Sequence, residues 1–578
     1  MRNNRHSSRI EKITGSAIRG TDNESVSMLC WFLKGCTKLI NNTFCNEKKV
    51  AHAVNHSCKS TIFSLKPLSK MLFASCILVG VSTPINAEAE KNAKEPPQKA
   101  VSKKLWSDKK IHIGQITITP GGFFAGEGVW RSRNIMTDIG SNFAAIPTLN
   151  LPQAYIHEFR LSARQSRLSA LAESNIDPQT LISGYVETDF LGNGSGNSNE
   201  SNSFDLRIRQ FYANIDWNQQ GWHLLAGQTW ALITLDKDGI TPRHEVLPPT
   251  IDAQYLVGFL WKRQPQLRLT KNFGQNFWAA VSAENAQTLF GGTPACVPAP
   301  IGVGPAFNGI SNIYCSAPGT QLLPAANLFS FNHVPDVIGK LAYQDTLNNH
   351  KVHLEVFGIY RDFYDRVYYT DGRKTNMNTT GYGAGIGTFI EIIPNKLDIQ
   401  GSTLLGSGIG SYSSGVLPDV TFAQNGSLKP IDEFTVMAGI TAHITPALDV
   451  YVFGGEERQK ATSFYSPPPT NNFFGLGTPN ANNSGCSTEG GVCEGNTKEL
   501  WQVTIGLWNK IYNGAYGQFR AGLQYSYTKR ILFPGTDAHQ DGVPVGKAVG
   551  GQTNDNMVFF SLRYFPFENS AAAPATMK

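Results

Sequence analysis

Hydrophobic and polar residues alternate with a period of two along most of the chain between residues 111 and 567. This period places neighbouring side chains on opposite faces of a β-strand, and it differs from the 3.6-residue period of an amphipathic helix. We expect an all-β fold. The pattern predicts sixteen strands, over residues 113–130, 157–173, 180–190, 204–217, 222–234, 255–270, 276–286, 335–346, 351–368, 379–393, 397–412, 432–443, 448–461, 498–512, 516–532 and 556–567.

The stretch SFDLRIRQFYANIDW illustrates the two faces of these strands. Leu206 and Ile208 share one face, and Arg207 and Arg209 share the other. Alternation alone fits two structures. In a soluble β-sandwich the arginines would face solvent, whereas in a membrane barrel they would face a water-filled lumen and the aliphatic side chains would face lipid.

The connections between the predicted strands favour the barrel. Short connections (NIDPQ, NQQG, NFGQ, LNN, PNK, TPA and YNGA) alternate with long ones that include GNGSGNSNES and YTDGRKTNMN. Tight turns on the periplasmic side and long loops outside are typical of outer-membrane barrels. We therefore predict a transmembrane antiparallel β-barrel of sixteen strands over residues 111–567, located in the bacterial outer membrane, with residues 568–578 as a C-terminal tail.

The N-terminal segment has the character of an export signal. Lys70 precedes an apolar run from Met71 to Val81, and the sequence INA ends at Ala87. This pattern predicts a secretory signal peptide that is cleaved after Ala87. Residues 1–69 are either an over-long gene start or a true extension. Residues 88–110 are polar and are expected to form a flexible periplasmic lead-in.

Removal of residues 1–87 changes the charge of the chain, which carries 50 basic and 44 acidic side chains in full. The remaining chain has 38 basic and 40 acidic side chains, so the excess of positive charge belongs to the targeting segment. A nucleic-acid partner therefore loses its main electrostatic support. The low charged fraction, 16%, and the 56 glycines suit an all-β chain with many turns.

Four cysteines remain after cleavage: Cys296, Cys315, Cys486 and Cys493. An even number of cysteines in an exported protein predicts disulfides, and pairing of near neighbours would place one bridge in each of two long external loops. A metal site is the alternative. It is disfavoured because the cysteines lack CxxC spacing and have no nearby histidine.

Five stretches carry a resemblance to a known family: GGFFAGEGVWRSRNI, EFRLSARQSRLSALAE, SGYVETDFLG, DLRIRQFYANIDW and LLAGQTWALIT. With these stretches the chain resembles porin-like outer-membrane proteins of Gram-negative bacteria, in particular DcaP-like trimeric porins. The resemblance implies a pore lined by arginines, a preference for anionic solutes and assembly as a homotrimer. The periplasmic coiled coil of DcaP-type porins has no counterpart here, since residues 88–110 are short and contain Pro96 and Pro97.

Charged residues on the predicted inner face concentrate in the first half of the barrel. Arg160 and Arg164 share a strand face and Arg167 does not. Either a β-bulge near Gln165 brings Arg167 to the same side, or Arg167 lies near a rim. One interpretation is a basic wall that attracts anionic solutes, and the other is an Arg–carboxylate network that leaves little net field. The predicted pore-lining residues are Arg160, Arg164, Arg167, Glu187, Asp189, Arg207, Arg209 and Arg268.

The segment LDKDGITPRHEVLPPTIDAQ follows the fifth predicted strand. By analogy with porins we expect it to fold into the pore and set its width, and the alternative is an ordinary exposed loop. Two prolines, Pro248 and Pro249, would stiffen it. The candidate constriction residues are Asp236, Asp238, Arg243 and Glu245, with His244 and Asp252 beside them.

No GxSxG, HExxH or Walker motif is present, and no cofactor or metal site is expected. The leading functional hypothesis is a passive diffusion channel for small hydrophilic solutes, in which a lumen wall of arginines would favour anionic ones. A surface-binding barrel that acts through its long loops is the alternative. An enzyme is the third hypothesis, and the sequence offers no catalytic constellation for it.

Overall fold

The computed structural model describes residues 106–568, apart from 108, 193–198, 200–203, 286, 297–300, 304–306, 308, 317–328, 469, 541–542 and 545. The described residues belong to one compact unit, Glu95–Lys578. The predicted signal segment 1–87, most of the lead-in 88–110 and residues 569–578 of the predicted tail lie outside the described residues.

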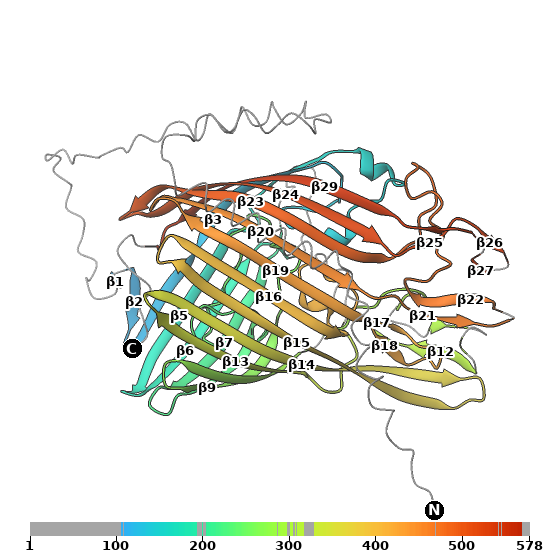
Figure 1. Cartoon of the computed structure of the whole chain (residues 1–578). Coiled ribbons are helices and arrows are strands. Elements are labelled where there is room, and N and C mark those ends of the chain that lie inside the picture. Colours follow the sequence, from blue (N-terminus) through green and yellow to red (C-terminus); the bar gives the residue numbers. More distant parts are fainter. Residues whose placement is uncertain are drawn as a thin grey trace, which may run out of the picture. The chain divides into compact units, whose positions relative to one another are not determined.

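Sixteen strands form a closed antiparallel barrel, in which each strand pairs with the next along the chain and the last pairs with the first (Figure 1). The strand β29 closes the barrel by pairing with β3 from Tyr564–Phe124 to Met557–Arg131. The fold class and strand number are confirmed. The barrel strands are β3 (Ile116–Arg131), β5 (Arg167–Asp177), β6 (Thr180–Asp189), β7 (Arg207–Trp217), β8 (Trp222–Trp230), β9 (Arg263–Phe273), β10 (Phe277–Glu284), β13 (Asp336–Leu347), β14 (His350–Tyr369), β15 (Lys374–Ile393), β16 (Leu397–Ser407), β19 (Asp432–His443), β20 (Leu448–Gln459), β23 (Thr497–Gly514), β24 (Gly517–Leu532) and β29 (Gln552–Phe565).

Shorter elements lie before the barrel and in its loops. No helix among the described residues is long and apolar enough to cross a membrane. The short strands are β1 (Trp106–Ser107), β2 (Lys110–Ile113), β4 (Glu158–Ser162), β11 (Ile301–Gly302), β12 (Ile310–Tyr314), β17 (Val420–Phe422), β18 (Leu428–Pro430), β21 (Thr462–Ser466), β22 (Asn472–Leu476), β25 (Gly535–Thr536), β26 (His539–Gln540), β27 (Val543–Pro544) and β28 (Ala548–Val549). The described 3-10 turns are η2 (Phe143–Ala145), η3 (Pro152–Tyr155) and η5 (Gly410–Tyr412).

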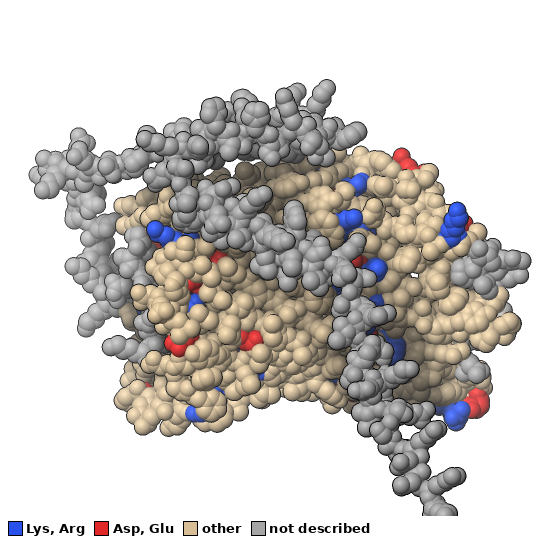
Figure 2. Space-filling view, viewed as in Figure 1, with Lys and Arg blue, Asp and Glu red and all other residues tan. Residues whose placement is uncertain are grey.

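The outer wall of the barrel is apolar. Leu206 and Ile208 are 58% and 52% exposed there, while their neighbour Arg209 is buried on the lumen side. In the space-filling view most of one face is free of charged side chains, which gather toward its two ends (Figure 2). A closed barrel with such a band satisfies its backbone hydrogen bonds internally and presents apolar side chains to lipid. The chain is therefore a bacterial outer-membrane barrel.

The two ends of the barrel differ in their connections. One end carries tight turns, for example those between β13 and β14 and between β23 and β24, and this end is the periplasmic one. The other end carries the long loops. One expected long loop, YTDGRKTNMN, is instead the tip of a tight hairpin, because β14 and β15 stay paired from Val352–Ile390 to Tyr368–Lys374.

The predicted strand 157–173 is interrupted between β4 and β5. Glu127 pairs with Ser162, and Phe123 pairs with Arg167, so four residues on one strand lie opposite three on the other. This extra residue is a β-bulge, and it reverses the side to which the following residues point. Arg167 consequently faces the lumen, as the expected bulge near Gln165 requires.

The predicted strand 255–270 begins only at Arg263. The apolar run from Tyr255 to Trp261 lies inside the barrel instead, and its residues Leu256 and Phe259 are fully buried. An apolar run of this length fits either a strand or a buried non-strand segment, and sequence periodicity cannot separate the two.

Two disulfides constrain the external loops. Cys296 is bonded to Cys315, with Cα atoms 6.0 Å apart, and Cys486 is bonded to Cys493, with Cα atoms 4.6 Å apart. The near-neighbour pairing is as expected from the sequence. Both thiol pairs are therefore unable to serve as metal ligands.

The lipid-facing position of Phe211, which is 61% exposed on β7, can be tested directly. We expect Phe211→Arg to lower the free energy of unfolding by about 2–4 kcal/mol, because a guanidinium near the bilayer midplane loses its hydration. Urea unfolding of the barrel refolded into lipid vesicles measures this quantity. The control, Phe211→Leu, should cost about 1 kcal/mol or less. Equal stability of the two variants would contradict the proposed orientation of β7.

Candidate functional site

Residues 231–262, which we call the lumen loop, connect β8 to β9 and cross the interior of the barrel. On one wall the Lys340 Nζ donates to Thr234 O at 2.7 Å, and Asp236 N donates to Glu355 Oε1 at 3.0 Å. Lys340 and Glu355 lie on β13 and β14. The first residues of the lumen loop are therefore attached to the inner side of β13 and β14.

The second half of the lumen loop is bound to strands on another part of the wall. Val257 N donates to Gln502 Oε1 at 2.9 Å, and Gly258 N donates to Glu457 Oε1 at 2.7 Å. The acceptors lie on β23 and β20, far along the barrel from β13 and β14. Side-chain acceptors on the wall thus satisfy backbone donors that water would otherwise have to satisfy.

Apolar packing holds the same part of the loop. Val257 and Phe259 are buried in a cluster with Tyr451 and Phe453, two inward-facing residues of β20. The backbone of the loop can approach β20 closely because Gly455 has no side chain: an added Cβ would collide with the Val257 carbonyl oxygen. The glycine at this position therefore sets how closely the lumen loop approaches β20.

The first half of the lumen loop is a small hairpin. Asp236 and Glu245 form a backbone bridge, and Val246 N donates to Leu235 O at 2.7 Å. Lys340 forms ion pairs with Asp236 at 3.0 Å and with Glu355 on β14 at 2.8 Å. This buried triad of one cation and two carboxylates fastens the hairpin to the wall.

Burial and like charge raise the pKa values of the two hairpin carboxyls. Burial is the main cause for Asp236, whose pKa is raised to about 6 although Lys340 lowers it. Burial and the neighbouring Asp236 charge raise the pKa of Glu245 to about 7. Burial also lowers the pKa of His244. The two carboxyls therefore titrate near neutral pH.

The other two predicted constriction residues have different surroundings. Asp238 is largely exposed and lies 3.7 Å from the His244 ring, so it is a surface group of the hairpin. The Arg243 guanidinium lies 5.5 Å from the ring of Tyr185, on the lumen side of β6. Of the four predicted residues, Asp236 and Glu245 thus fasten the hairpin and Arg243 contacts the wall.

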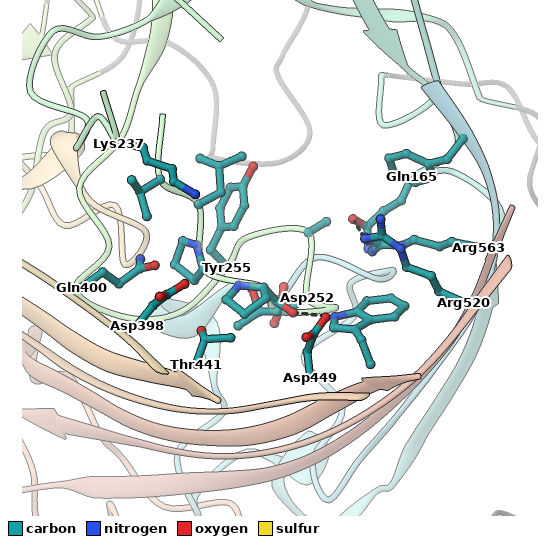
Figure 3. Close-up of a pocket in the computed structure, with 18 of the residues that line it drawn as sticks. Gln165, Lys237, Asp252, Tyr255, Asp398, Gln400, Thr441, Asp449, Arg520 and Arg563 are labelled. Carbon is teal, nitrogen blue, oxygen red and sulfur yellow. Dashed lines mark hydrogen bonds between the residues drawn. The ribbon is translucent and has the colours of Figure 1, made fainter. Parts of the chain in front are cut away.

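Between the lumen loop and the periplasmic end lies a cavity of about 400 Å³ (Figure 3). Arg520 and Arg563 point into it from β24 and β29, and Asp398 and Asp449 point into it from β16 and β20, further round the same wall. We call the first group, with Arg167 and Arg209, the basic wall. The second group, with His443, is the acidic wall. Lys237, Asp252 and Tyr255 reach the cavity from the lumen loop.

Carboxylates outside the cavity position the basic wall. Arg209 bonds Glu187 at 2.6 Å and Asp189 at 2.9 Å, and Arg563 bonds Glu127 at 2.8 Å. Arg167 lies 3.7 Å from Glu187. These pairs fix the guanidinium planes and also cancel part of their charge.

Some cations near the lumen lack such compensation. Lys237 has no ion pair among the described residues, and its Nζ lies 5.2 Å from the ring of Phe389. Arg263 likewise has no described ion pair, and its guanidinium lies 5.2 Å from the rings of both Trp230 and Trp261. The carboxylate that bonds Arg520, Glu568 at 2.7 Å, is 44% exposed and screened by water. These three cations are therefore less compensated by carboxylates than Arg209 and Arg563 are.

The acidic wall is a hydrogen-bonded group at the periplasmic ends of β16, β19 and β20. His443 Nδ1 lies 2.6 Å from Asp449 Oδ1, and His443 Nε2 lies 3.1 Å from Asp398 Oδ2. Lys510 bonds Asp449 from the neighbouring strand at 3.3 Å. The acidic wall adjoins the basic wall, since Asp449 on β20 lies two strands from Arg520 on β24, and a solute in the cavity experiences a transverse field between the carboxylates and the guanidinium groups.

The predicted pore-lining residues divide into three groups. Arg167 and Arg209 line the cavity, and Glu187 and Asp189 support them. Arg207 pairs with Asp189 at 2.8 Å above the lumen loop. The remaining three lie elsewhere: Arg160 is half exposed beside Glu158, Arg164 bonds Asp138 at 2.9 Å, and Arg268 donates to Trp230 O at 2.6 Å.

The sequence interpretation missed Arg520 and Arg563, which lie in the last two strands. They are direct partners in the β24–β29 register and lie next to the first strands only because the barrel closes. The one available signal was their inward parity on strands already predicted. Asp398 and Asp449 sit at strand starts beside tight turns, where parity alone suggests no role. The described residues contain no group of three or more His, Cys, Asp or Glu placed to hold a metal ion.

The seating of the lumen loop on Gly455 predicts the effect of a single methyl group. We expect Gly455→Ala to displace the loop from β20, raise single-channel conductance and lower the free energy of unfolding by about 1–3 kcal/mol. Planar-bilayer recording and urea unfolding measure the two effects. Gly339→Ala is the matched control, because an added Cβ there meets no atom within 4 Å. Unchanged conductance in a folded Gly455→Ala protein would show that this contact does not limit the pore.

The raised pKa of Glu245 predicts a pH-dependent stability. A carboxyl whose pKa is higher in the folded state stabilises the fold while it is protonated in that state and loses this contribution as pH rises toward its folded pKa of about 7. Glu245→Gln cannot ionise, so its free energy of unfolding relative to the parent should be about 2–3 kcal/mol higher at pH 8 than at pH 5. Urea unfolding at both pH values tests this. The same difference at both would contradict the burial argument.

No protein-family model and no curated protein matches the chain. Among solved structures, it is similar to the outer membrane channel DcaP of Acinetobacter baumannii, at 17% identity and a TM-score of 0.49, over 78% of this chain and 97% of that chain. It is similar to an anion-selective porin from Comamonas acidovorans at 10% identity and a TM-score of 0.40, over 78% and 99%. It is also similar to OprB of Pseudomonas putida at 8% identity and a TM-score of 0.39, over 77% and 94%. The barrel assignment rests on this chain's own strand pairings.

Proposed function

We propose that the protein is a passive diffusion channel of the outer membrane that prefers small anionic solutes. The observation that carries the proposal is the basic wall, with Arg167, Arg209, Arg520 and Arg563 lining one side of the cavity below the lumen loop. A sixteen-stranded barrel is wide enough for an aqueous lumen, whereas an eight-stranded barrel is filled by its side chains. The lumen loop narrows that width, so solutes pass close to the arginines.

The order of the cations supports a path for an anion. Arg263 and Arg207 lie at the external ends of β9 and β7, Arg209 and Arg167 lie deeper, and Arg563 and Arg520 lie near the periplasmic end. Each guanidinium stays charged at any physiological pH and offers a planar pair of donors to a carboxylate or phosphate. An anion can therefore exchange one partner for the next and does not have to leave a single deep site.

The acidic wall limits how strong the preference can be. Asp398 and Asp449 repel anions from their side of the cavity and draw cations toward it. The proposal is a moderate preference for anions, with zwitterions oriented by the transverse field. A homotrimer is the assembly that the family resemblance implies, and it belongs to the same proposal.

A surface-binding barrel is the second proposal. The observation in its favour is the pair of disulfides, which constrain the external loops 285–335 and 460–496 in the way that a defined binding surface needs. The placement of the lumen loop inside the barrel supports the channel, because a barrel that served only to display loops would not need it.

Replacement of two lumen cations tests the selectivity. In a planar bilayer with a KCl gradient, we expect a reversal potential that indicates anion preference, and a lower preference in the double variant Lys237→Gln, Arg520→Gln. A unit charge at ~10 Å in water shifts the energies of an anion and of a cation by roughly 0.4 kcal/mol in opposite directions, so each removal should lower the anion-to-cation ratio about fourfold. Neither residue has a buried carboxylate partner, so the variant should fold.

Lys460→Gln is the matched control. Lys460 is exposed on an external loop, where it pairs with the exposed Asp432 at 3.5 Å, and its removal should leave the reversal potential unchanged. Steady channels whose selectivity does not respond to the double variant would contradict the basic-wall proposal. A folded barrel without any conductance would overturn the channel and favour the surface-binding proposal.

A further inference from the structure

Residues 408–431, which we call the covering loop, connect β16 to β19 and start at the external end of the barrel. Their two short strands, β17 and β18, pair with each other and stay outside the wall sheet. Every residue from Gly408 to Gly415 is buried, whereas a loop that only crossed the surface would leave its backbone in contact with water. The covering loop therefore packs against the interior of the molecule.

The covering loop lies directly on the lumen loop. Leu260 and Ser413 form an antiparallel backbone bridge, and Trp261 N donates to Tyr412 O at 3.0 Å. The opposite side of this part of the lumen loop is bound to β20 and β23. The second half of the lumen loop is thus held between the barrel wall and the covering loop.

Side chains reinforce the contact between the two loops. Gln254 Nε2 donates to Ser414 O at 2.9 Å, and Ser414 Oγ donates back to Gln254 O at 2.8 Å. Trp261 Nε1 donates to the same Ser414 hydroxyl oxygen at 2.9 Å. The two loops therefore share a specific polar interface, which would be lost if either loop moved alone.

One carboxylate of the wall binds both loops. Glu457 lies on β20 and is 1% exposed. Its Oε1 accepts from Gly258 N of the lumen loop at 2.7 Å and from Gly415 N of the covering loop at 2.8 Å, and its Oε2 accepts from Ser413 Oγ at 2.6 Å. Glu457 has no ion pair among the described residues, so these hydrogen bonds compensate the hydration that the carboxylate loses on burial.

A neighbouring acceptor of the wall binds the lumen loop alone. Gln502 Oε1, on β23, accepts from Val257 N at 2.9 Å, one residue before Gly258. In the described part of the chain Gln502 makes no hydrogen bond to the covering loop. Like Glu457, Gln502 is 1% exposed. The two acceptors therefore differ in the number of loops that they hold.

We propose that Glu457 is a positioning residue that joins the covering loop to the lumen loop, so that the two loops together set the width of the pore. The inference rests on the proposed channel function. A carboxylate suits this role because its two oxygens can accept from donors of both loops at once. Its loss would leave three buried donors unpaired and would free both loops together. The alternative is that each loop is seated independently and that the lumen loop alone limits the pore.

Hydrogen exchange of the full-length refolded barrel, followed by mass spectrometry, tests this joint. We expect Glu457→Ala to speed exchange about tenfold in both segments, 254–262 and 408–415, because a hydrogen bond to a charged group contributes at least a factor of that size. The matched control Gln502→Ala should speed exchange in 254–262 and leave 408–415 as in the parent. Faster exchange in only one segment of Glu457→Ala would overturn the proposal.

Glu457→Gln separates the hydrogen bonds of this residue from its charge. The amide keeps one oxygen for Gly258 N and Gly415 N, and the Ser413 hydroxyl can then donate to Gly410 O, which lies 3.2 Å away. We therefore expect Glu457→Gln to exchange as the parent does. Exchange as fast as in Glu457→Ala would contradict a joint made of hydrogen bonds.

Single-channel recording in a planar bilayer tests the effect on the pore. Glu457→Ala should raise the conductance, because both loops become free to move aside. A disulfide formed after refolding in Leu260→Cys, Ser413→Cys should return the conductance to the parent value, since the two positions are direct partners in an antiparallel bridge.

In the parent background the same disulfide should leave the conductance unchanged, because the loops already move together. A changed conductance there would show that the loops move separately, and it would overturn the proposal even if Glu457→Ala does not fold. A parent barrel without any channels would overturn the proposed function, while hydrogen exchange would still decide whether Glu457 joins the loops.

Discussion

The closure of the sheet by β29 and β3 is the constraint on which the rest of the structure depends. Lipid offers no hydrogen-bond partners, so a sheet can cross the membrane only if it has no open edge. Closure gives every strand two neighbours and separates the side chains into a lipid face and a lumen face. It also brings the first and last strands together, so that Arg563 bonds Glu127, a residue more than four hundred positions away.

Ion pairs and a folded loop fill much of the lumen of this barrel. Charged side chains on the lumen side are held in pairs that stiffen the wall, as in the contacts of Arg209 with Glu187 and Asp189. The lumen loop spans the interior because wall side chains satisfy its backbone donors and because Gly455 leaves room for it. Fixed groups thus fill much of the width of the barrel and leave a charged cavity.

The outer surface of the barrel is arranged in layers that match the membrane. Aliphatic residues meet the acyl chains, and tyrosines mark the interface. The hairpin of β14 and β15 extends this alternation beyond the strands that flank it, because β13 and β16 stop pairing with it at Tyr360 and Tyr382. Alternate side chains of each strand therefore face two different environments, the aqueous lumen on one side and lipid on the other.

The sequence by itself determined the wall of this protein. Period-two alternation, the alternation of short and long connections and the cysteine spacing are local properties, because each depends on residues close together in the chain. Tertiary structure decided which residues from distant parts of the chain come into contact. Arg520 and Arg563 join Arg167 and Arg209 only through closure. The apolar run from Tyr255 to Trp261 lies in the lumen and not in the wall, since its burial partners come from β20 and β23, about two hundred residues further along the chain.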